Sequence, residues 1–102
     1  MRPKRNKKLA AYYRKMACQV CEGYDQVSGD HIITFGSRPD LDCVENMMAL
    51  CFKHHREKED TGVAPFAKAY GLHDDLIRRG MEFCEVYGWY FPHDFIPKMQ
   101  ID

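Results

Sequence analysis

The sequence predicts a small α+β domain, and three observations lead to this fold class. The chain has 102 residues, a length that fits one domain and leaves no room for a second hydrophobic core. Two short apolar runs, residues 31–35 and 47–51, have the composition of strands. Segments of helical composition precede and follow these runs. We therefore expect a two-stranded hairpin with flanking helices.

Three stretches of this single domain differ in character. Residues 1–17 form a basic arm that includes a helix, residues 18–60 form the core, and residues 61–102 form a helical extension of the same domain. The arm holds seven of the 15 Lys and Arg residues and no acidic residue, whereas the rest carries eight basic residues against 15 acidic ones. Such an arm suits contact with a nucleic-acid backbone, because Lys and Arg displace the condensed counterions. A solubilising tail explains the same charge equally well.

The first elements of the chain can be assigned from spacing and composition. A helix is expected over residues 6–16, where apolar side chains recur at spacings of three and four. The first strand, residues 31–35, is β-branched and aromatic, and it lies between Gly29 and a turn at residues 36–40. The sequence therefore predicts a helix, a turn that contains two cysteines, and then a strand.

The remaining elements follow the same logic. The second strand occupies residues 47–51, and the charged residues 52–60 form a helix that stops before Gly62. Two more helices are expected over about residues 64–70 and about residues 72–87. The tail after them contains too many prolines for regular structure.

Two short-range pairs of cysteine and histidine indicate a metal site. Cys18 and Cys21 form a C-x-x-C pair, and Cys51 and His54 repeat the spacing as C-x-x-H. Structural zinc takes four nitrogen or sulfur ligands with no open position, and two pairs brought together by a hairpin meet that need. We therefore predict a structural zinc knuckle, with coincidentally placed cysteines as the alternative. A redox pair is disfavoured because no βαβ pattern surrounds Cys18.

The cysteine count also bears on the compartment. The chain has five cysteines, and an odd number of them argues against a disulfide framework. No N-terminal stretch has the pattern of a signal peptide, and no apolar run reaches the length of about 18 residues that a transmembrane helix needs. We expect a cytoplasmic protein without a membrane partner.

Three further segments carry histidine and asparagine in a fixed order. They are Gly29-Asp30-His31-Ile32, Glu45-Asn46-Met47-Met48-Ala49-Leu50-Cys51 and His54-His55-Arg56-Glu57-Lys58. Together with the cysteine pairs they span residues 18–60, under half of the chain. This pattern resembles the HNH endonuclease family, most of all its small zinc-bearing bacteriophage and prophage members. The resemblance implies a ββα-metal fold and metal-dependent hydrolysis of DNA phosphodiester bonds.

The resemblance also implies a role for each residue of the pattern. His31 would deprotonate the attacking water, since a neutral imidazole is a suitable base near neutral pH. Asp30 and His55 would ligate one divalent ion, and Asn46 would tie the long loop to the second strand and orient His31. Glu59 lies four residues after His55, on the same helix face, and is a candidate third ligand. The alternative for Glu59 is a solvated carboxylate.

Two features of the metal ligands stay open at this point. Magnesium is the first expectation for the catalytic ion, but manganese, nickel and zinc also suit one carboxylate and one imidazole. The commonest zinc-bearing pattern has a second cysteine where this chain has His54. Either of the adjacent histidines could therefore bind zinc, and the nine-residue separation between Asn46 and His55 favours His54 as the zinc ligand.

The resemblance implies DNA as the partner, together with phage or host proteins of recombination or replication, and the cytoplasm of the host cell as the compartment if the protein is phage-encoded. Arg38, in the turn after the first strand, is a candidate phosphate contact. The basic arm adds further candidates, Lys4, Arg5, Lys7 and Lys8. Residues 89–91 are aromatic and could stack on an unpaired base, although such a cluster more often seals a core. A non-catalytic zinc-knuckle module that binds nucleic acid or protein is the main alternative function.

Overall fold

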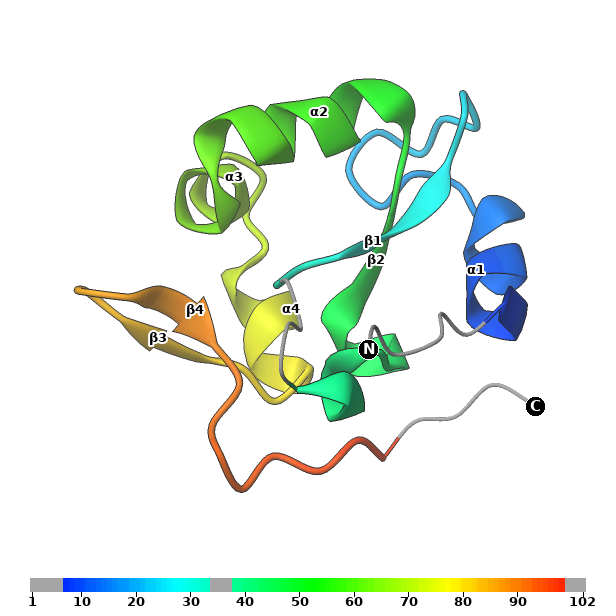
Figure 1. The fold of residues 1–102 in the computed structure, drawn as a ribbon. Helices are drawn as coiled ribbons and strands as arrows, with labels where there is room; N and C mark the ends of the chain where they lie inside the picture. The colour runs from blue at the N-terminus through cyan, green and yellow to red at the C-terminus, as the bar shows by residue number, and fades with distance from the viewer. Residues whose placement is uncertain (1–6, 34–37, 99–102) are drawn as a thin grey trace.

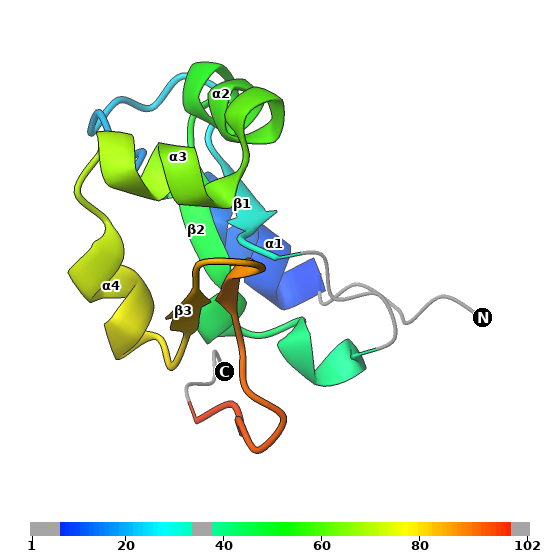
Figure 2. The same cartoon turned by 90° about the vertical axis from the view of Figure 1, so that its left-hand side faces the viewer.

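The described part of the chain, residues 7–33 and 38–98 of the computed structural model, contains four α-helices and two antiparallel hairpins (Figures 1 and 2). The sequence prediction of a small α+β domain is confirmed at this level. None of the helices in these described residues combines the length and the apolar character needed to cross a lipid bilayer.

A short central hairpin forms the middle of the hydrophobic core. Strand β1 (Ser28–His31) pairs with strand β2 (Met47–Leu50) in a register that places His31 opposite Met47. All four residues of β2 are buried. The second strand is therefore where the sequence predicts it, and the hairpin brings Asp30 and His31 to one end of the paired segment.

Helix α1 (Lys7–Arg14) packs closely against β1, because a glycine lies at the point of contact (Figure 1). A Cβ atom at Gly29 would be 2.9 Å from Tyr13 Cβ and 2.5 Å from Met47 Cε. The hydroxyl of Tyr13 donates to the carbonyl of Val44 at 3.3 Å. The helix lies within the range expected from the apolar spacing of the arm.

Helices α2 and α3 follow the central hairpin. Helix α2 (Phe52–Thr61) begins directly after Cys51 and ends at Gly62, which has a φ of 91° and donates its N–H to Lys58 O at 2.8 Å. Positive φ favours glycine, so this residue stops the helix. Helix α3 (Val63–Ala69) then packs against α2 (Figure 2). Both helices end within one residue of the predicted boundaries.

The predicted first strand at residues 31–35 is wrong, because β1 begins three residues earlier and ends at His31. The Ile32 N–H still donates to Asn46 O at 2.8 Å, in register with the paired strands. The Ile33 N–H instead donates to the side-chain Oδ1 of Asn46 at 3.0 Å. The last two residues of the predicted strand lie outside the described residues. The apolar character of Ile32 thus reflects its burial in the core.

The long helix predicted over residues 72–87 is also wrong. Helix α4 spans only His73–Arg78, and Gly80 follows it with a φ of 96°. The N–H of Met81 returns to Leu76 O at 3.1 Å, which satisfies a carbonyl at the end of the helix in the manner of a Schellman motif. The glycine therefore ends the helix, although the apolar spacing in the sequence continues beyond it.

A second hairpin replaces the rest of that helix. Strand β3 (Glu82–Cys84) pairs with strand β4 (Gly88–Tyr90), so the expected helical extension over residues 61–102 is in part β-structure. Trp89 and Phe91 are buried in the hydrophobic core. Trp89 and Phe91 thus contribute to sealing the core, whereas Tyr90, between them in the sequence, is exposed.

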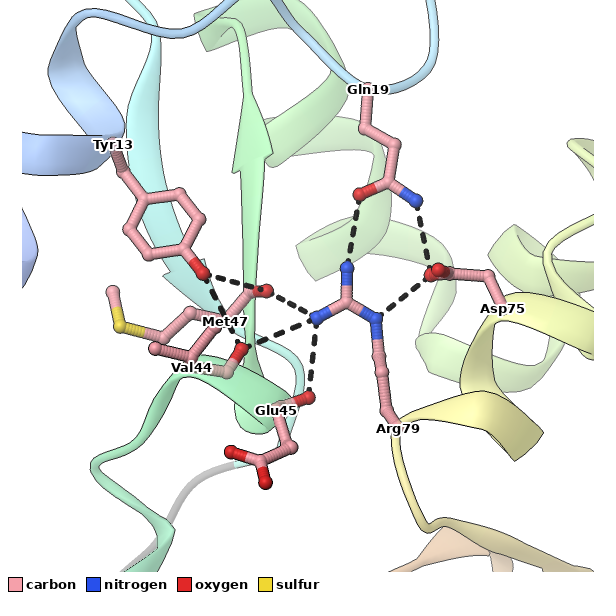
Figure 3. Close-up of polar contacts among 7 residues, drawn as sticks. All are labelled: Tyr13, Gln19, Val44, Glu45, Met47, Asp75 and Arg79. Carbon is pink, nitrogen blue, oxygen red and sulfur yellow. Dashed lines mark hydrogen bonds and ion pairs between the residues drawn. The ribbon is translucent and has the colours of Figure 1, made fainter. Parts of the chain in front are cut away.

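The side chain of Arg79 ties helix α4 to the central hairpin and to the segment after α1 (Figure 3). Its Nη1 donates to Glu45 O at 3.2 Å and also to Met47 O. Its Nη2 donates to Gln19 Oε1 at 3.1 Å, and its Nε donates to Asp75 Oδ2 at 2.8 Å. One guanidinium therefore satisfies main-chain carbonyls at the start of β2 and joins three segments distant in sequence.

Replacing this guanidinium should destabilise the fold. We expect Arg79→Met to lower the free energy of unfolding by about 2–3 kcal/mol, because hydrogen bonds to a charged donor are lost and partly buried carbonyls are left without it. Urea denaturation followed by circular dichroism measures the change. The neighbouring exposed Arg78 is the matched control, and Arg78→Met should shift the free energy by about 0.5 kcal/mol or less. Equal effects of the two substitutions would contradict the role assigned to Arg79.

Candidate functional site

The four predicted zinc ligands lie together at the beginning of α2. Cys18 and Cys21 come from the turn after α1, Cys51 precedes α2, and His54 lies in its first turn. One ligand atom from each of these residues lies within 4.8 Å of all the others. In the part of the chain that the structure describes, this is the only group of three or more such side chains that could hold a metal ion.

The distances within this Cys3His cluster suit a tetrahedral ion. Cys21 Sγ and Cys51 Sγ are 3.8 Å apart, and Cys18 Sγ lies 3.7 Å from His54 Nδ1. Two thiolates that each lie about 2.3 Å from one tetrahedral zinc ion are about 3.8 Å from each other. The cluster could therefore hold a metal ion such as zinc in a closed set of four ligands.

Main-chain hydrogen bonds shape the first cysteine pair. The N–H of Cys18 donates to Gly23 O at 2.7 Å, and the N–H of Gln19 donates to Ala49 O at 2.8 Å, which docks the turn on β2. Burial opposes ionisation of the Cys18 thiol, but backbone N–H groups, that of Cys51 first, donate to it and lower its pKa to about 6. A thiolate is the form that binds metal.

The adjacent histidines face different groups of side chains, so the structure shows which of the two belongs with the cysteines. His54 is buried, as are Cys18 and Cys51, and its ring packs against Tyr70 with centroids 5.4 Å apart. His55 instead turns toward Asp30 at the end of β1, with Nδ1 3.0 Å from Oδ1. His54 is thus the histidine of the Cys3His cluster, and His55 belongs to a second group of side chains.

This second group lies around the end of the central hairpin, where α2 meets β1. The side chains of Asp30 and His55 contact each other, whereas those of His31 and Asn46 contact Asp42 and the connection between the strands. Asp30 is buried, and its carboxylate lies between His55 and Lys58, with Oδ2 2.7 Å from Lys58 Nζ. His31 directly follows Asp30 in β1, and its Nε2 lies 2.9 Å from Asp42 Oδ1. The structure therefore brings Asp30, His31 and His55 to the same end of the central hairpin.

Asp42 and Lys58 are the residues of this group that sequence reasoning missed. Asp42 precedes β2 at no characteristic spacing from His31, so no sequence signal marks it as a partner. Lys58 lies three residues after His55, which places both on one face of α2. That helical spacing was a usable signal, since an inward lysine on this face needs an acidic partner.

Asn46 is fully buried and holds the chain that follows His31. Its Nδ2 donates to Ile33 O at 2.8 Å and to Leu41 O at 2.9 Å, while its Oδ1 accepts from the Ile33 N–H at 3.0 Å. The amide thus ties both ends of the long connection between the strands to the start of β2. The expected geometric role, a tie between loop and strand, matches these contacts.

The geometry of Asp30 and His55 fits two ligands of a divalent ion. Among the described residues, two buried atoms here, His55 Nδ1 and Asp30 Oδ2, make no hydrogen bond. They lie at ion-pair distances from Asp30 Oδ1, 3.0 Å, and from Lys58 Nζ, 2.7 Å. Two adjacent ligands of an octahedral ion at about 2.1 Å are about 3.0 Å apart. Glu59 does not join them, because its Oε1 lies 3.0 Å from the other ring nitrogen, Nε2. The third-ligand hypothesis for Glu59 is therefore not supported by this arrangement.

Among the candidate DNA contacts, only Arg38 and Lys8 have described side chains. Arg38 donates to Phe91 O at 3.0 Å and to Asp40 Oδ2 at 2.9 Å, so its guanidinium anchors the segment after β4. Lys8 is exposed on α1. Lys4 and Arg5 lie outside the described residues, and Lys7 is described only as the first residue of α1. These positions leave the DNA-binding hypothesis for the arm as a prediction.

Taken together, the structure presents a Cys3His cluster that could hold a metal such as zinc and, at the other side of α2, a group of histidines and carboxylates. Comparison of the chain with protein-family models, with curated proteins and with solved structures finds no match in any of the three.

Loss of one cysteine should abolish metal binding by the cluster. We expect purified protein to hold about one zinc ion per chain and Cys51→Ser to hold almost none, since three ligands leave the tetrahedral site open. Elemental analysis after gel filtration gives the stoichiometry, and thermal unfolding should show a lower midpoint for the variant. Cys84→Ser is the control and should keep the ion, because Cys84 lies outside the cluster. Wild-type protein that folds without a metal ion would contradict this prediction.

The role of the Asn46 amide can be tested by a substitution that replaces its NH2 group with an oxygen. Asn46→Asp keeps an acceptor for the Ile33 N–H but cannot donate to the two carbonyls when it is ionised. We expect the free energy of unfolding to fall by about 2–4 kcal/mol, the cost of two buried acceptors that lose their donors. Urea denaturation at neutral pH measures it. A variant as stable as the wild type would show that these contacts contribute nothing.

Proposed function

We propose that this protein is a metal-dependent endonuclease of the HNH type, with the ββα-metal arrangement, and that it hydrolyses phosphodiester bonds in DNA. The observation that supports the proposal is the contact between Asp30 of β1 and His55 of α2, with His31 and Asn46 next to it at the same end of the central hairpin. These are the residues that the histidine and asparagine pattern of the sequence singles out. The two strands and the following helix supply the element order that such a site requires.

His31 is the general base of the proposed reaction. Its Nε2 faces the carboxylate of Asp42 at 2.9 Å, and a carboxylate on one ring nitrogen fixes the orientation of the imidazole. Asn46 fixes the chain after His31 through its contacts with Ile33, so the base is held by its own strand and by the loop that follows.

Asp30 and His55 are the proposed ligands of the catalytic ion. When bound there, a divalent ion would supply positive charge for the phosphate oxygens and for the departing oxygen. Asp30 Oδ1 and His55 Nδ1 come from different elements, β1 and α2, and the ligand pair therefore depends on how the helix docks on the strand. Magnesium is the ion we expect first, because it binds with few protein ligands and keeps several waters.

The Cys3His cluster supports the proposal indirectly. It brings Cys51 and His54 at the start of α2 to the turn that holds Cys18 and Cys21. Bound zinc would thereby fix the position of the helix that carries His55. If the catalytic assignment fails, the same cluster favours the second candidate function, a non-catalytic zinc module that binds nucleic acid or protein.

A plasmid assay tests the proposed function directly. We expect supercoiled DNA incubated with the protein and magnesium or manganese to be converted to nicked or linear forms, with no conversion in EDTA. His31→Ala should reduce the rate by about 100-fold or more, the contribution of a general base. His93→Ala is the control, because His93 is exposed and lies outside the site, and it should cut like the wild type.

The outcome of this assay separates the candidate functions. Folded, zinc-loaded protein that cuts no DNA with any divalent ion would contradict the endonuclease proposal. Cutting that survives in the His31→Ala variant would contradict the role of His31. Measurement of the nicked and linear products over time would also show whether one strand or both strands are cut.

A further inference from the structure

Lys58 is a buried cation inside the candidate catalytic site. It is only 8% exposed, and a buried ammonium group is costly unless opposite charge and hydrogen-bond acceptors surround it. Its Nζ lies 2.7 Å from Asp30 Oδ2 and donates to the main-chain carbonyl of His31 at 3.2 Å. One side chain of α2 thus contacts both of the β1 residues to which the proposed reaction assigns chemistry.

The carboxylate of Asp30 is divided between two residues of α2. Oδ2 faces Lys58, whereas Oδ1 faces His55 Nδ1 at 3.0 Å. Lys58 and His55 are three residues apart in the helix, hence on one face. The ammonium group therefore lies beside one carboxylate oxygen and leaves the other directed at the imidazole nitrogen.

We propose that Lys58 is a positioning residue, which holds the Asp30 carboxylate so that Oδ1 and His55 Nδ1 together bind the divalent ion. This inference rests on the proposed function and adds a residue that orients one of the two proposed metal ligands. Partners of this kind orient metal-binding carboxylates in proteins, and their loss typically weakens metal binding or activity by about 10–100-fold.

Two effects of Lys58 on the ion oppose each other. Its positive charge repels a divalent cation, which would make removal of the charge strengthen binding. Without Lys58, however, the buried carboxylate of Asp30 can rotate and approach His55 through either oxygen. Lys58 contacts Oδ2 of Asp30 and the main-chain oxygen of His31, so it leaves Oδ1, the oxygen that faces His55, open to the ion. We therefore expect the benefit of a fixed Asp30 carboxylate to outweigh the repulsion between the ammonium group and the ion.

Manganese binding tests the inference without reference to cutting. Zinc-loaded protein is titrated with Mn²⁺, and the free ion is followed by electron paramagnetic resonance. We expect Lys58→Met, which keeps the length and apolar stem of the side chain, to bind Mn²⁺ about 10–100-fold more weakly than the wild type. Lys68→Met is the control, because Lys68 is exposed on α3, and its affinity should stay within about twofold of the wild type.

A second variant keeps the test decisive if Lys58→Met does not fold. Lys58→Gln removes the charge but retains an N–H donor, and it should bind Mn²⁺ with an affinity between those of the wild type and the methionine variant. Circular dichroism and zinc content establish that each variant is folded. Folded Lys58 variants that bind Mn²⁺ as tightly as the wild type, or more tightly, would overturn the inference and leave the proposed function standing. Wild-type protein that binds no Mn²⁺ beyond its zinc would overturn both.

Discussion

The buried amide of Asn46 is the constraint on which the candidate catalytic site depends. The connection between β1 and β2 is long, and a short two-stranded hairpin has few ladder hydrogen bonds with which to hold it. Asn46 supplies the missing bonds at both ends of that connection, through Ile33 and Leu41. The position of His31 at the end of β1, and of Asp42 in the connection, therefore depends on one side chain that itself performs no proton transfer.

The local spacing of residues in the sequence was enough to predict the Cys3His cluster and the elements around it. The C-x-x-C and C-x-x-H pairs place two ligands each on a short turn, and a turn constrains neighbours without reference to the rest of the fold. Helix α2 and strand β2 were likewise predictable, because Gly62 ends the former and a wholly apolar run forms the latter. Each of these features depends on residues within a few positions of each other.

Features that depend on tertiary contacts could not be predicted in the same way. Ser28 and Gly29 have little strand propensity, yet they pair with β2 because the buried register of the hairpin requires it. The apolar stripe that suggested a long last helix continues past Gly80, where backbone conformation rather than hydrophobicity ends α4. The contact between His31 and Asp42 joins a strand end to a loop, so composition and spacing give no sign of it.

The close packing at Gly29 has a consequence for how this protein can vary. Any side chain at this position would press on Tyr13 of α1 and on Met47 of β2, and Met47 is the residue paired with His31. A substitution there would therefore push Tyr13, and α1 with it, away from β1, whereas the flexible end of the Met47 side chain can move aside. The separation between α1 and the central hairpin is thus set by a residue without a side chain, and a larger residue at this point would require the helix to dock elsewhere.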